Sequence, residues 1–276
     1  MKDNKRVNWT ATILLILGSL LILFPLYLTV VTAFKTQPEI AANSIFALPE
    51  SWRFDNFTKA IELTGFFQAF WNSLVITVPT VILTVFAHSI IGYVIARNMH
   101  KKSYKVIYYY IVSAMFVPFS ILMLPLVTQT ASWGIDNRYG MILLYLVLNL
   151  AFNIFLYTGF IKSIPMELEE AAVIDGASEW QIFWRVIFPL LKPMNATVAI
   201  LTTLGTWNDF MLPLVILGGR RQAATIPLTQ YIFESQFSAN YSLAFASYLL
   251  AILPMLLVYI LAQKWIINGV TRGALK

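Results

Sequence analysis

The chain has 276 residues, of which 59% are hydrophobic and only 12% are charged. Soluble domains average about 45–50% apolar and about 25% charged residues, so the composition argues against a soluble domain and indicates a membrane protein. Membrane topology explains the formal net charge of +6, so no nucleic-acid partner is expected, and the absence of cysteine excludes disulfides, thiol nucleophiles and cysteine metal sites.

Six apolar runs are long enough to cross a membrane, because about 20 residues of helix span about 30 Å of hydrocarbon. These runs are approximately residues 11–34, 70–96, 106–127, 140–161, 194–217 and 242–263. The first run is too long for a cleaved signal peptide and lacks its flanks, so a retained helix is expected. The predicted fold is therefore an all-α membrane protein, with residues 1–276 forming one transmembrane domain.

The distribution of Lys and Arg predicts the orientation of these spans. If the N-terminus is cytoplasmic, the inner segments hold 13 of the 19 Lys and Arg residues and the outer segments hold 6. Because six crossings return the chain to the same side, both termini are expected in the cytoplasm. The connections at 97–105 and 162–193 are then cytoplasmic, and those at 35–69, 128–139 and 218–241 are external.

The connection at 163–193 has a more regular pattern than a spacer needs. Pro165 suits the first turn of a helix, the glutamates after it suit the positive end of the helix dipole, and Gly176 is a typical stop. A short helix is therefore predicted near residues 165–175.

A second short helix is predicted after this turn. Ser178 and Gln181 form a capping box, and Pro189 is expected to limit the helix. Its Trp and Phe side chains are expected to pack in part on the membrane helices. The first helix instead offers small residues and an acidic face, which suit the arginines and the groove of another protein.

One pattern in this loop matches a known motif, through Glu170, Ala171, Ala172, Asp175, Gly176, Val186, Phe188 and Pro189. The spacing resembles the EAA loop of binding-protein-dependent ABC permeases, EAA-x3-G-x9-I-x-L-P, with Val and Phe in place of Ile and Leu. Trp207-Asn208-Asp209 is similar to a segment in the fifth span of sugar-type permeases, and the ending Gly269–Lys276 resembles the tail of maltose permease G subunits. The resemblance covers essentially the whole chain.

This resemblance implies a fold, a location and a set of partners. The implied fold is the type I ABC importer permease, with six transmembrane helices and a cytoplasmic helix–turn–helix coupling loop, in a multi-pass protein of a bacterial plasma (inner) membrane. The implied partners are a second homologous permease subunit, two ATP-binding subunits, an extracytoplasmic solute-binding protein, a carbohydrate substrate and membrane lipid.

The resemblance also implies how transport is driven. The coupling residues would be Glu170, Ala171, Ala172, Asp175, Gly176 and Pro189. The sequence contains no phosphate loop of the form GxxxxGK followed by Ser or Thr, so the chain is expected to be no enzyme and to bind no cofactor. ATP and magnesium are expected on the partner ATPase.

Two positions inside the spans leave alternatives open. Asp209 is an acidic residue inside the predicted fifth span, and charged residues within a span usually face a cavity or a partner. It suits either a sugar-binding or gating role together with Trp207 and Asn208, or a helix cap near the external interface. His88 is interpreted as a satisfied bundle residue in preference to a proton relay, and no residue cluster has metal-ligand spacing.

Two other transport functions compete with sugar import by an ABC permease. The first is an ABC permease for a non-sugar solute such as glycerol phosphate, although basic residues are expected along such a pathway. The second is a stand-alone secondary transporter, which usually needs intramembrane carboxylates or histidines for a coupling ion. The spans provide only Asp209 and His88 for that purpose.

Overall fold

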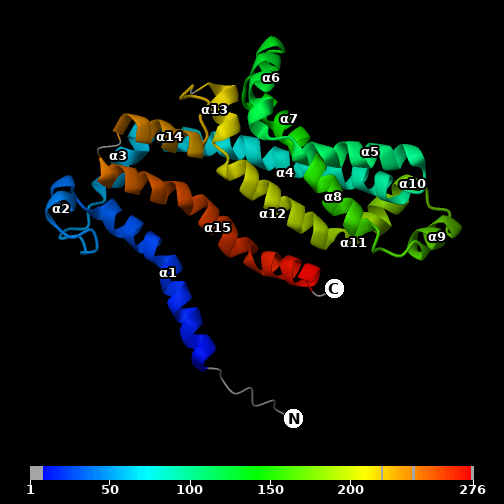
Figure 1. The fold of residues 1–276 in the computed structure, drawn as a ribbon, viewed down its shortest axis with the longest axis horizontal. Coiled ribbons are helices and arrows are strands. Elements are labelled where there is room, and N and C mark those ends of the chain that lie inside the picture. Colours follow the sequence, from blue (N-terminus) through cyan, green and yellow to red (C-terminus); the bar gives the residue numbers. More distant parts are fainter. Residues whose placement is uncertain (1–8, 219, 238–239, 275–276) are drawn as a thin grey trace. The chain divides into compact units, whose positions relative to one another are not determined.

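A computed structural model describes residues 9–218, 220–237 and 240–274, without the side chains of 232, 234–239, 261–262 and 264–274. Within these residues every regular element is a helix, which confirms the predicted all-α class (Figure 1). Of the tail at 269–276, Leu275 and Lys276 lie outside the described residues, as do the N-terminal cations at positions 2, 5 and 6.

The elements in chain order are α1 (Trp9–Phe34), α2 (Gln37–Ala42), α3 (Asp55–Thr64), α4 (Phe66–Arg97), α5 (Lys102–Ser113), η1 (Ala114–Phe116), α6 (Phe119–Ser132), α7 (Arg138–Leu148), α8 (Leu150–Ile161), α9 (Glu167–Ile174), α10 (Glu179–Ile182), η2 (Phe183–Ile187), α11 (Phe188–Leu190), α12 (Lys192–Asn208), α13 (Met211–Leu217), α14 (Ile226–Phe237) and α15 (Tyr241–Ala274). They form two compact units. The first comprises the described parts of Met1–Phe67 and Thr229–Leu256, and the second those of Gln68–Leu228 and Leu257–Lys276.

Three helices are long and apolar enough to cross a membrane: α1, α4 and the Tyr241–Ile260 part of α15. Three further pairs of helices pass the same test together but are bent, so the described residues contain up to six spans if each pair forms one crossing. The bends are 101° between the α5–η1 segment and α6, 45° between α7 and α8, and 74° between the α10–α11 segment and α12.

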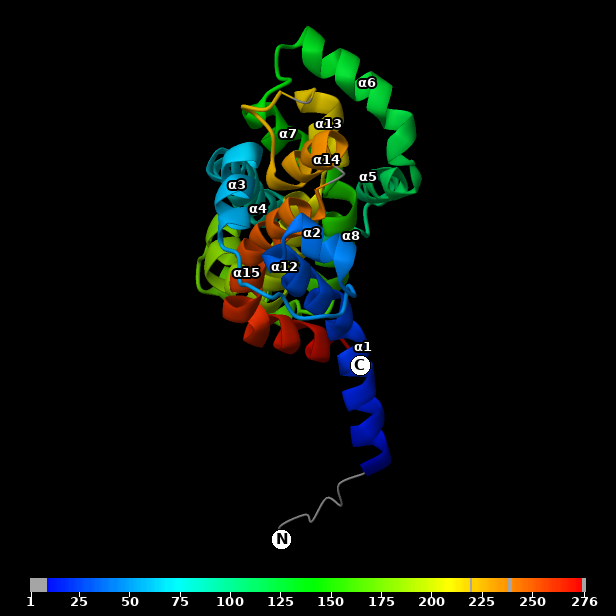
Figure 2. The ribbon, with the colours of Figure 1, turned by 90° about the vertical axis from the view of Figure 1, so that its left-hand side faces the viewer.

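The apolar run at 106–127 is divided between the α5–η1 segment and α6. The chain leaves the helix at Val117 and Pro118, which are both extended, and Figure 2 shows α6 turned away from α5. The cause is local, because proline has no N–H to donate and its ring disfavours helical geometry in the preceding residue. The run at 194–217 is also interrupted, because α12 ends at Asn208 and Asp209 is extended.

In the first unit, the segment predicted as external is ordered. The ring of Phe34 contacts Trp52, Phe54 and Phe57 at centroid distances of 4.9, 5.2 and 5.0 Å. The carboxylate of Glu39 accepts the Thr36 amide at 2.6 Å and the Glu50 amide at 2.8 Å. The hydrogen bond from the Thr36 amide holds the pKa of the Glu39 carboxyl below its ordinary value.

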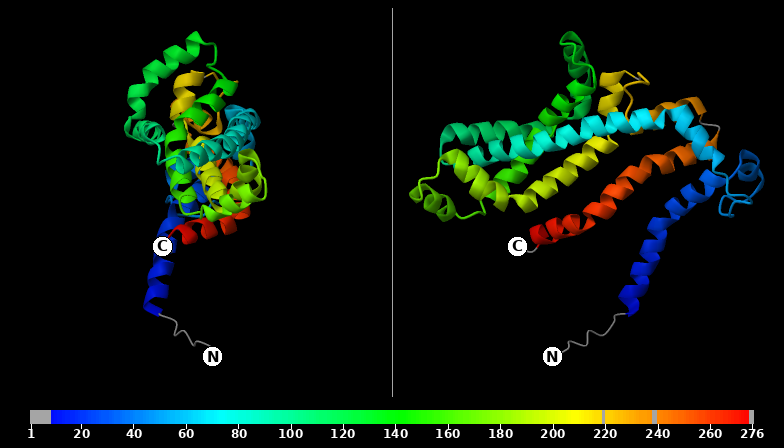
Figure 3. Two further views of the ribbon diagram at one scale, coloured as in Figure 1. Left: turned by 90° about the vertical axis from the view of Figure 1, so that its right-hand side faces the viewer. Right: turned by 180° about the vertical axis from the view of Figure 1, so that it is seen from behind.

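In the second unit, α4, α8 and α12 run side by side (Figures 1 and 3). A core cluster joins these helices to the loop at 163–193 through Ala96, Tyr157, Ile161, Ile164, Ile182, Phe183, Ile187, Leu191 and Val198. Helix α4 approaches α8 closely at Gly92, where an added Cβ would lie 2.6 Å from the Cβ of Tyr157.

The close contact at Gly92 predicts that a methyl group added there destabilises the protein, whereas one added at an open position does not. Gly92→Ala should destabilise the bundle by about 1–3 kcal/mol, because the core must shift to admit it. Gly159→Ala on α8 is the matched control, because nothing lies within 4 Å of its added Cβ. The measurement is the thermal unfolding midpoint of each purified variant in detergent. Equal midpoints for the two variants would contradict the close packing.

Candidate functional site

The loop at 163–193 folds as a helix–turn–helix, as predicted. The first helix, α9, begins at Glu167, two residues after Pro165, and ends at Ile174. Gly176 then has a φ of 81°, a left-handed conformation that glycine adopts without steric cost. The Ser178 capping box is confirmed, since its hydroxyl accepts the Gln181 amide at 3.3 Å and the Gln181 side chain accepts the Ser178 amide at 2.9 Å.

Pro189 was expected to limit the second helix, and the helix ends one residue after it, at Leu190. The helical path reaches this point through the π-helical turn η2 and then α11. In this wide turn the amide of Phe188 donates to the carbonyl of Phe183, five residues earlier. A widened turn accommodates a proline because its ring would clash with the carbonyl four residues before it in an α-helix.

The second helix of the loop packs against α4, as expected for its aromatic residues. The ring of Phe86 on α4 lies 5.6 Å from the ring of Phe188 in a stacked arrangement and 5.7 Å from that of Trp184. Phe183 is buried in the core cluster and contacts Tyr93 at 5.3 Å. These contacts make the second helix a support that is fixed to α4.

The first helix is fixed to α4 by a buried ion pair. Arg97, the last residue of α4, places Nη2 2.6 Å and Nε 2.7 Å from Oε1 of Glu169. The hydroxyl of Tyr93 donates to Oε2 of Glu169 at 2.7 Å, and Arg97 Nη2 donates to the carbonyl of Ile164 at 3.1 Å. The side chains of Arg97 and Glu169 are only 12% and 9% exposed.

This ion pair corrects the prediction of a single acidic face. Glu169 is directed into the protein, whereas Glu167 and Glu170 are exposed. Arg97 and Tyr93 were not singled out in the sequence, because nothing in their local pattern identifies a partner 72 or 76 residues away. The sequence did show a cation at the end of a span and an acidic loop that could face it. It did not show which glutamate of that loop pairs with Arg97.

The structure brings most of the predicted coupling residues onto one exposed surface of α9 and its turn. Glu170, Ala171, Asp175 and Gly176 are exposed, and so is Ile174, at 86%. Ala172 differs, because it packs against the core cluster. Pro189 is exposed on α11, away from this surface in the chain. We call Glu170, Ala171, Ile174, Asp175 and Gly176 the α9 surface.

The three residues predicted near the fifth span have different environments. Trp207 is only 6% exposed and packs edge-on against Phe70 at 5.9 Å, so its ring does not present a free face. Asn208 is exposed and donates to the carbonyl of Leu204 at 2.9 Å. Asp209 accepts the amides of Met211 at 2.9 Å and Leu212 at 3.4 Å, which is the geometry of a helix cap for α13.

Asp209 and His88 also contact residues of other helices. The hydroxyl of Tyr145 on α7 donates a hydrogen bond to the carboxylate of Asp209 at 3.0 Å. His88 is buried, and its Nδ1 lies 3.2 Å from the Asn153 amide nitrogen on α8, whereas its Nε2 is buried without a hydrogen-bond partner among the described residues. The described residues contain no group of three or more His, Cys, Asp or Glu side chains that could hold a metal ion.

A bundle of apolar helices, with a helix–turn–helix locked to one end of it, is the architecture of a polytopic membrane protein. The model of the family "binding-protein-dependent transport system inner membrane component" matches residues 88–272, and the chain belongs to this family.

Curated relatives match over the full length of the chain. The multiple sugar-binding transport system permease protein MsmG of Streptococcus mutans is 40% identical to this chain, and the match covers 100% of both proteins. The probable starch degradation products transport system permease protein AmyC of Thermoanaerobacterium thermosulfurigenes is 36% identical over 98% of this chain and 97% of that protein.

Solved structures show the same fold. A chain of a bacterial ABC transporter that imports the acidic polysaccharide alginate has a TM-score of 0.78 at 24% identity, covering 96% of this chain and 98% of that one. A second alginate transporter structure, in complex with a periplasmic protein bound to alginate pentasaccharide, has a TM-score of 0.71 at 19% identity, covering 92% of each chain. The predicted ABC importer permease fold is thereby confirmed.

Proposed function

We propose that this chain is the permease subunit of an ATP-driven importer that moves a sugar or oligosaccharide into the cytoplasm. The relatives named above are permeases for multiple sugars and for starch degradation products, at 40% and 36% identity over nearly the whole chain. The observation that carries the proposal is the α9 surface, which is exposed on a helix that the Arg97–Glu169 pair fixes to α4.

Coupling of transport to ATP hydrolysis follows from the exposed α9 surface and from the Arg97–Glu169 pair that fixes α9 to α4. Two partner ATPase subunits, which hold ATP and magnesium, close on each other and displace α9 through its exposed surface. The Arg97–Glu169 pair transmits this displacement to α4, and the Phe86–Phe188 stack transmits it from the second helix to the same span. Because buried, close-packed contacts deform little, the helices move as a body, which suits alternating access.

The proposed assembly follows from the family and the orientation. The chain pairs with a second homologous permease subunit in a bacterial plasma membrane, with both termini in the cytoplasm. The loop at 163–193 then faces the ATPases, and the connections at 128–139 and 218–241 face an extracytoplasmic solute-binding protein. A charge distribution with most Lys and Arg residues on the cytoplasmic side supports this orientation.

The helix-cap contacts of Asp209 allow a structural role of its carboxylate to be separated from a role in the substrate pathway. Asp209→Ala should destabilise the protein by about 1–2 kcal/mol, because α13 loses its cap and Tyr145 its acceptor. Asp209→Asn should retain both stability and uptake, because asparagine caps helices as well as aspartate does. The measurements are the unfolding midpoint and solute uptake. A stable Asn variant without uptake would instead assign the carboxylate to the pathway.

The proposed function is tested by reconstitution. The chain is assembled with its partner permease, the ATPase subunits and the solute-binding protein in liposomes, and uptake of a panel of sugars is measured. We expect uptake of at least one sugar that requires both ATP and the binding protein. Proton-driven flux by the purified chain alone, without an ATPase, would refute the proposal in favour of a secondary transporter.

A further inference from the structure

Residues 44–48, which follow α2 in the first unit, form a turn that we call the apolar turn. Three of its side chains are large, apolar and well exposed, at 47%, 55% and 63%: Ile45, Phe46 and Leu48. The base of the turn is polar, because the side-chain amide of Asn43 donates to the carboxylate of Glu50 at 3.0 Å. No charged residue lies between these two. An exposed apolar tip on a polar base indicates a contact surface.

Three consecutive backbone carbonyls of the apolar turn accept hydrogen bonds from side chains. Nζ of Lys35 donates to the carbonyls of Ser44, at 3.2 Å, and Ile45, at 3.3 Å. The hydroxyl of Tyr27 donates to the carbonyl of Phe46 at 2.8 Å. Tyr27 lies on α1 and Lys35, which is only 1% exposed, follows the last residue of that helix. Such internal hydrogen bonds are what a backbone needs in lipid, because acyl chains offer none.

The apolar turn lies beside α1 and not beyond its end. The ring of Phe46 packs against that of Phe24 on α1, at a centroid distance of 5.8 Å. Helix α1 has 26 residues and is therefore about 39 Å long, which exceeds the hydrocarbon thickness of about 30 Å. Tyr27 lies about 10 Å before the end of the helix at Phe34. The turn therefore reaches the level at which lipid headgroups give way to acyl chains.

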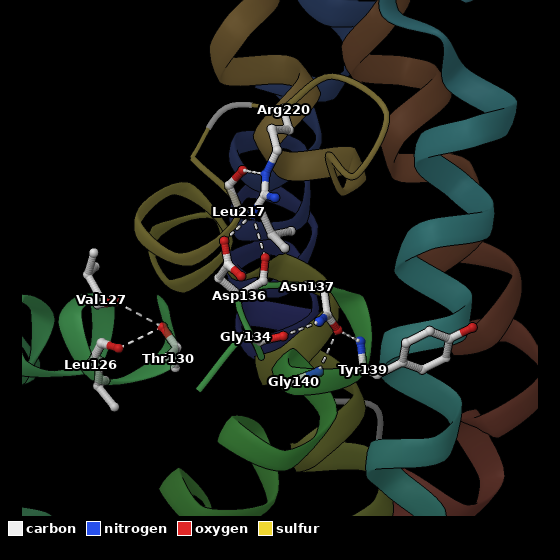
Figure 4. A network of polar contacts seen from close by, with 10 residues as sticks. All are labelled: Leu126, Val127, Thr130, Gly134, Asp136, Asn137, Tyr139, Gly140, Leu217 and Arg220. Carbon is white, nitrogen blue, oxygen red and sulfur yellow. Dashed lines mark hydrogen bonds and ion pairs between the residues drawn. The ribbon is translucent and has the colours of Figure 1, made fainter. Parts of the chain in front are cut away.

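The connections before α7 and after α13 differ from the apolar turn, because they expose charged and amide groups. Arg220 pairs with the carboxylate of Asp136 at 2.9 Å, and these side chains are 54% and 40% exposed (Figure 4). The Asn137 side chain accepts the amides of Tyr139 and Gly140, as Figure 4 also shows. These groups suit contact with water, which the exposed apolar side chains of the turn do not.

We propose that the apolar turn inserts into the lipid leaflet at the C-terminal end of α1, held there by Tyr27 and Lys35, and anchors the first unit in the membrane. This is the outer leaflet under the orientation of the proposed function, on which that part of the inference rests. Acyl chains suit the surface better than a protein does, because the turn has no charge and its carbonyls are already bonded. Trp52, which is 53% exposed and packs on Phe34 at the end of α1, suits the headgroup level above it.

The test measures the surroundings of a nitroxide spin label on the turn. The chain has no cysteine, so Leu48→Cys, and Thr58→Cys at an exposed position on α3, each give one site that is labelled before assembly. The whole transporter is then reconstituted in phosphatidylcholine liposomes. Oxygen concentrates among acyl chains, and nickel ethylenediaminediacetate stays in water. Oxygen should relax the label at position 48 severalfold more than the nickel complex does, and the order should be reversed at position 58.

Two further substitutions test whether the hydrogen bonds to α1 position the turn. Tyr27→Phe removes the donor to one carbonyl, and Lys35→Met removes the donor to the other two. In each variant the access of the nickel complex to the label at position 48 should rise severalfold, because a carbonyl without a donor favours water. Lys59→Met, at an exposed position on α3, is the control and should leave this access unchanged. Tyr27→Phe alone decides the matter if Lys35→Met does not fold.

Ready access of the nickel complex to the label at position 48 would place the turn in water and overturn the proposal. Low access of both reagents would mean that a protein surface covers the turn and would also overturn it. An impermeant maleimide applied to intact cells should react with Thr58→Cys. Reaction from the cytoplasmic side alone would refute the orientation in the proposed function, whereas a label at position 48 that oxygen relaxes would still support insertion, so the two failures are distinct.

Discussion

Arg97→Gln should abolish ATP-driven uptake while the chain remains in the membrane. The substitution leaves the Glu169 carboxylate buried without its cation, and breaking a buried ion pair in this way costs about 3–5 kcal/mol. Releasing α9 from α4 avoids that cost by returning Glu169 to water. The expected result is a loop that still docks on the ATPase but no longer moves the spans. ATP hydrolysis and uptake would become uncoupled.

Hydrogen exchange of the α9 amides and uptake by the reconstituted transporter are the two measurements. Lys105→Gln is the matched control, because it removes an exposed cation from α5 near the same end of the bundle. The double variant Arg97→Met with Glu169→Leu should restore protection of α9, since apolar residues of similar volume often replace a buried ion pair without loss of stability.

The uptake of these variants decides between two roles for the pair. If the double variant also restores uptake, the pair serves as a mechanical link that packing can replace. Exchange in Arg97→Gln that matches the unaltered chain, together with normal uptake, would show that the pair does not hold the loop.

Local signals in the sequence predicted local structure well. The apolar runs identified the membrane helices because burial in lipid requires uninterrupted apolar length. Ser178, Gln181 and Gly176 identified the turn of the loop because capping and left-handed geometry depend on residues within one helical turn. The structural effect of a proline was harder to predict from its neighbours in the chain, because Pro118 separates two helices whereas the helical path continues one residue beyond Pro189. A proline breaks one helix and is absorbed by a π-turn in another, according to what packs around it.

Features that depend on distant parts of the chain could not be read from the sequence. The partner of Glu169 is 72 residues away, and three neighbouring glutamates offered the same charge to Arg97. Trp207 was a candidate for sugar stacking because aromatic residues suit that role, but Phe70 from α4 covers it. In both cases the residue type was informative about chemistry, and the tertiary contact determined whether that chemistry was available.

Glu170→Lys should prevent docking of the ATPase and abolish uptake without unfolding the permease. The Glu170 side chain is exposed and makes no hydrogen bond or ion pair within the described part of the chain, so its replacement removes no internal contact. Reversing its charge opposite an arginine of the partner would cost several kcal/mol, which corresponds to at least about a hundredfold loss of affinity. Recovery of the ATPase with the purified permease measures this loss directly, and uptake measures its consequence.

Glu62→Lys makes the same charge change at an exposed position of α3, on the predicted external side, and should leave ATPase recovery unchanged. Ile174→Ala provides an independent arm, because Ile174 is 86% exposed and four residues after Glu170 on the same helix face. Its truncation cannot open a cavity in the isolated chain, yet it should weaken docking by about 1–3 kcal/mol if the partner buries it. Normal ATPase recovery and uptake in Glu170→Lys would refute docking through the α9 surface. Loss in Glu170→Lys alone would assign the contact to charge, whereas loss in both variants requires that the partner cover the whole helix face, as a groove would.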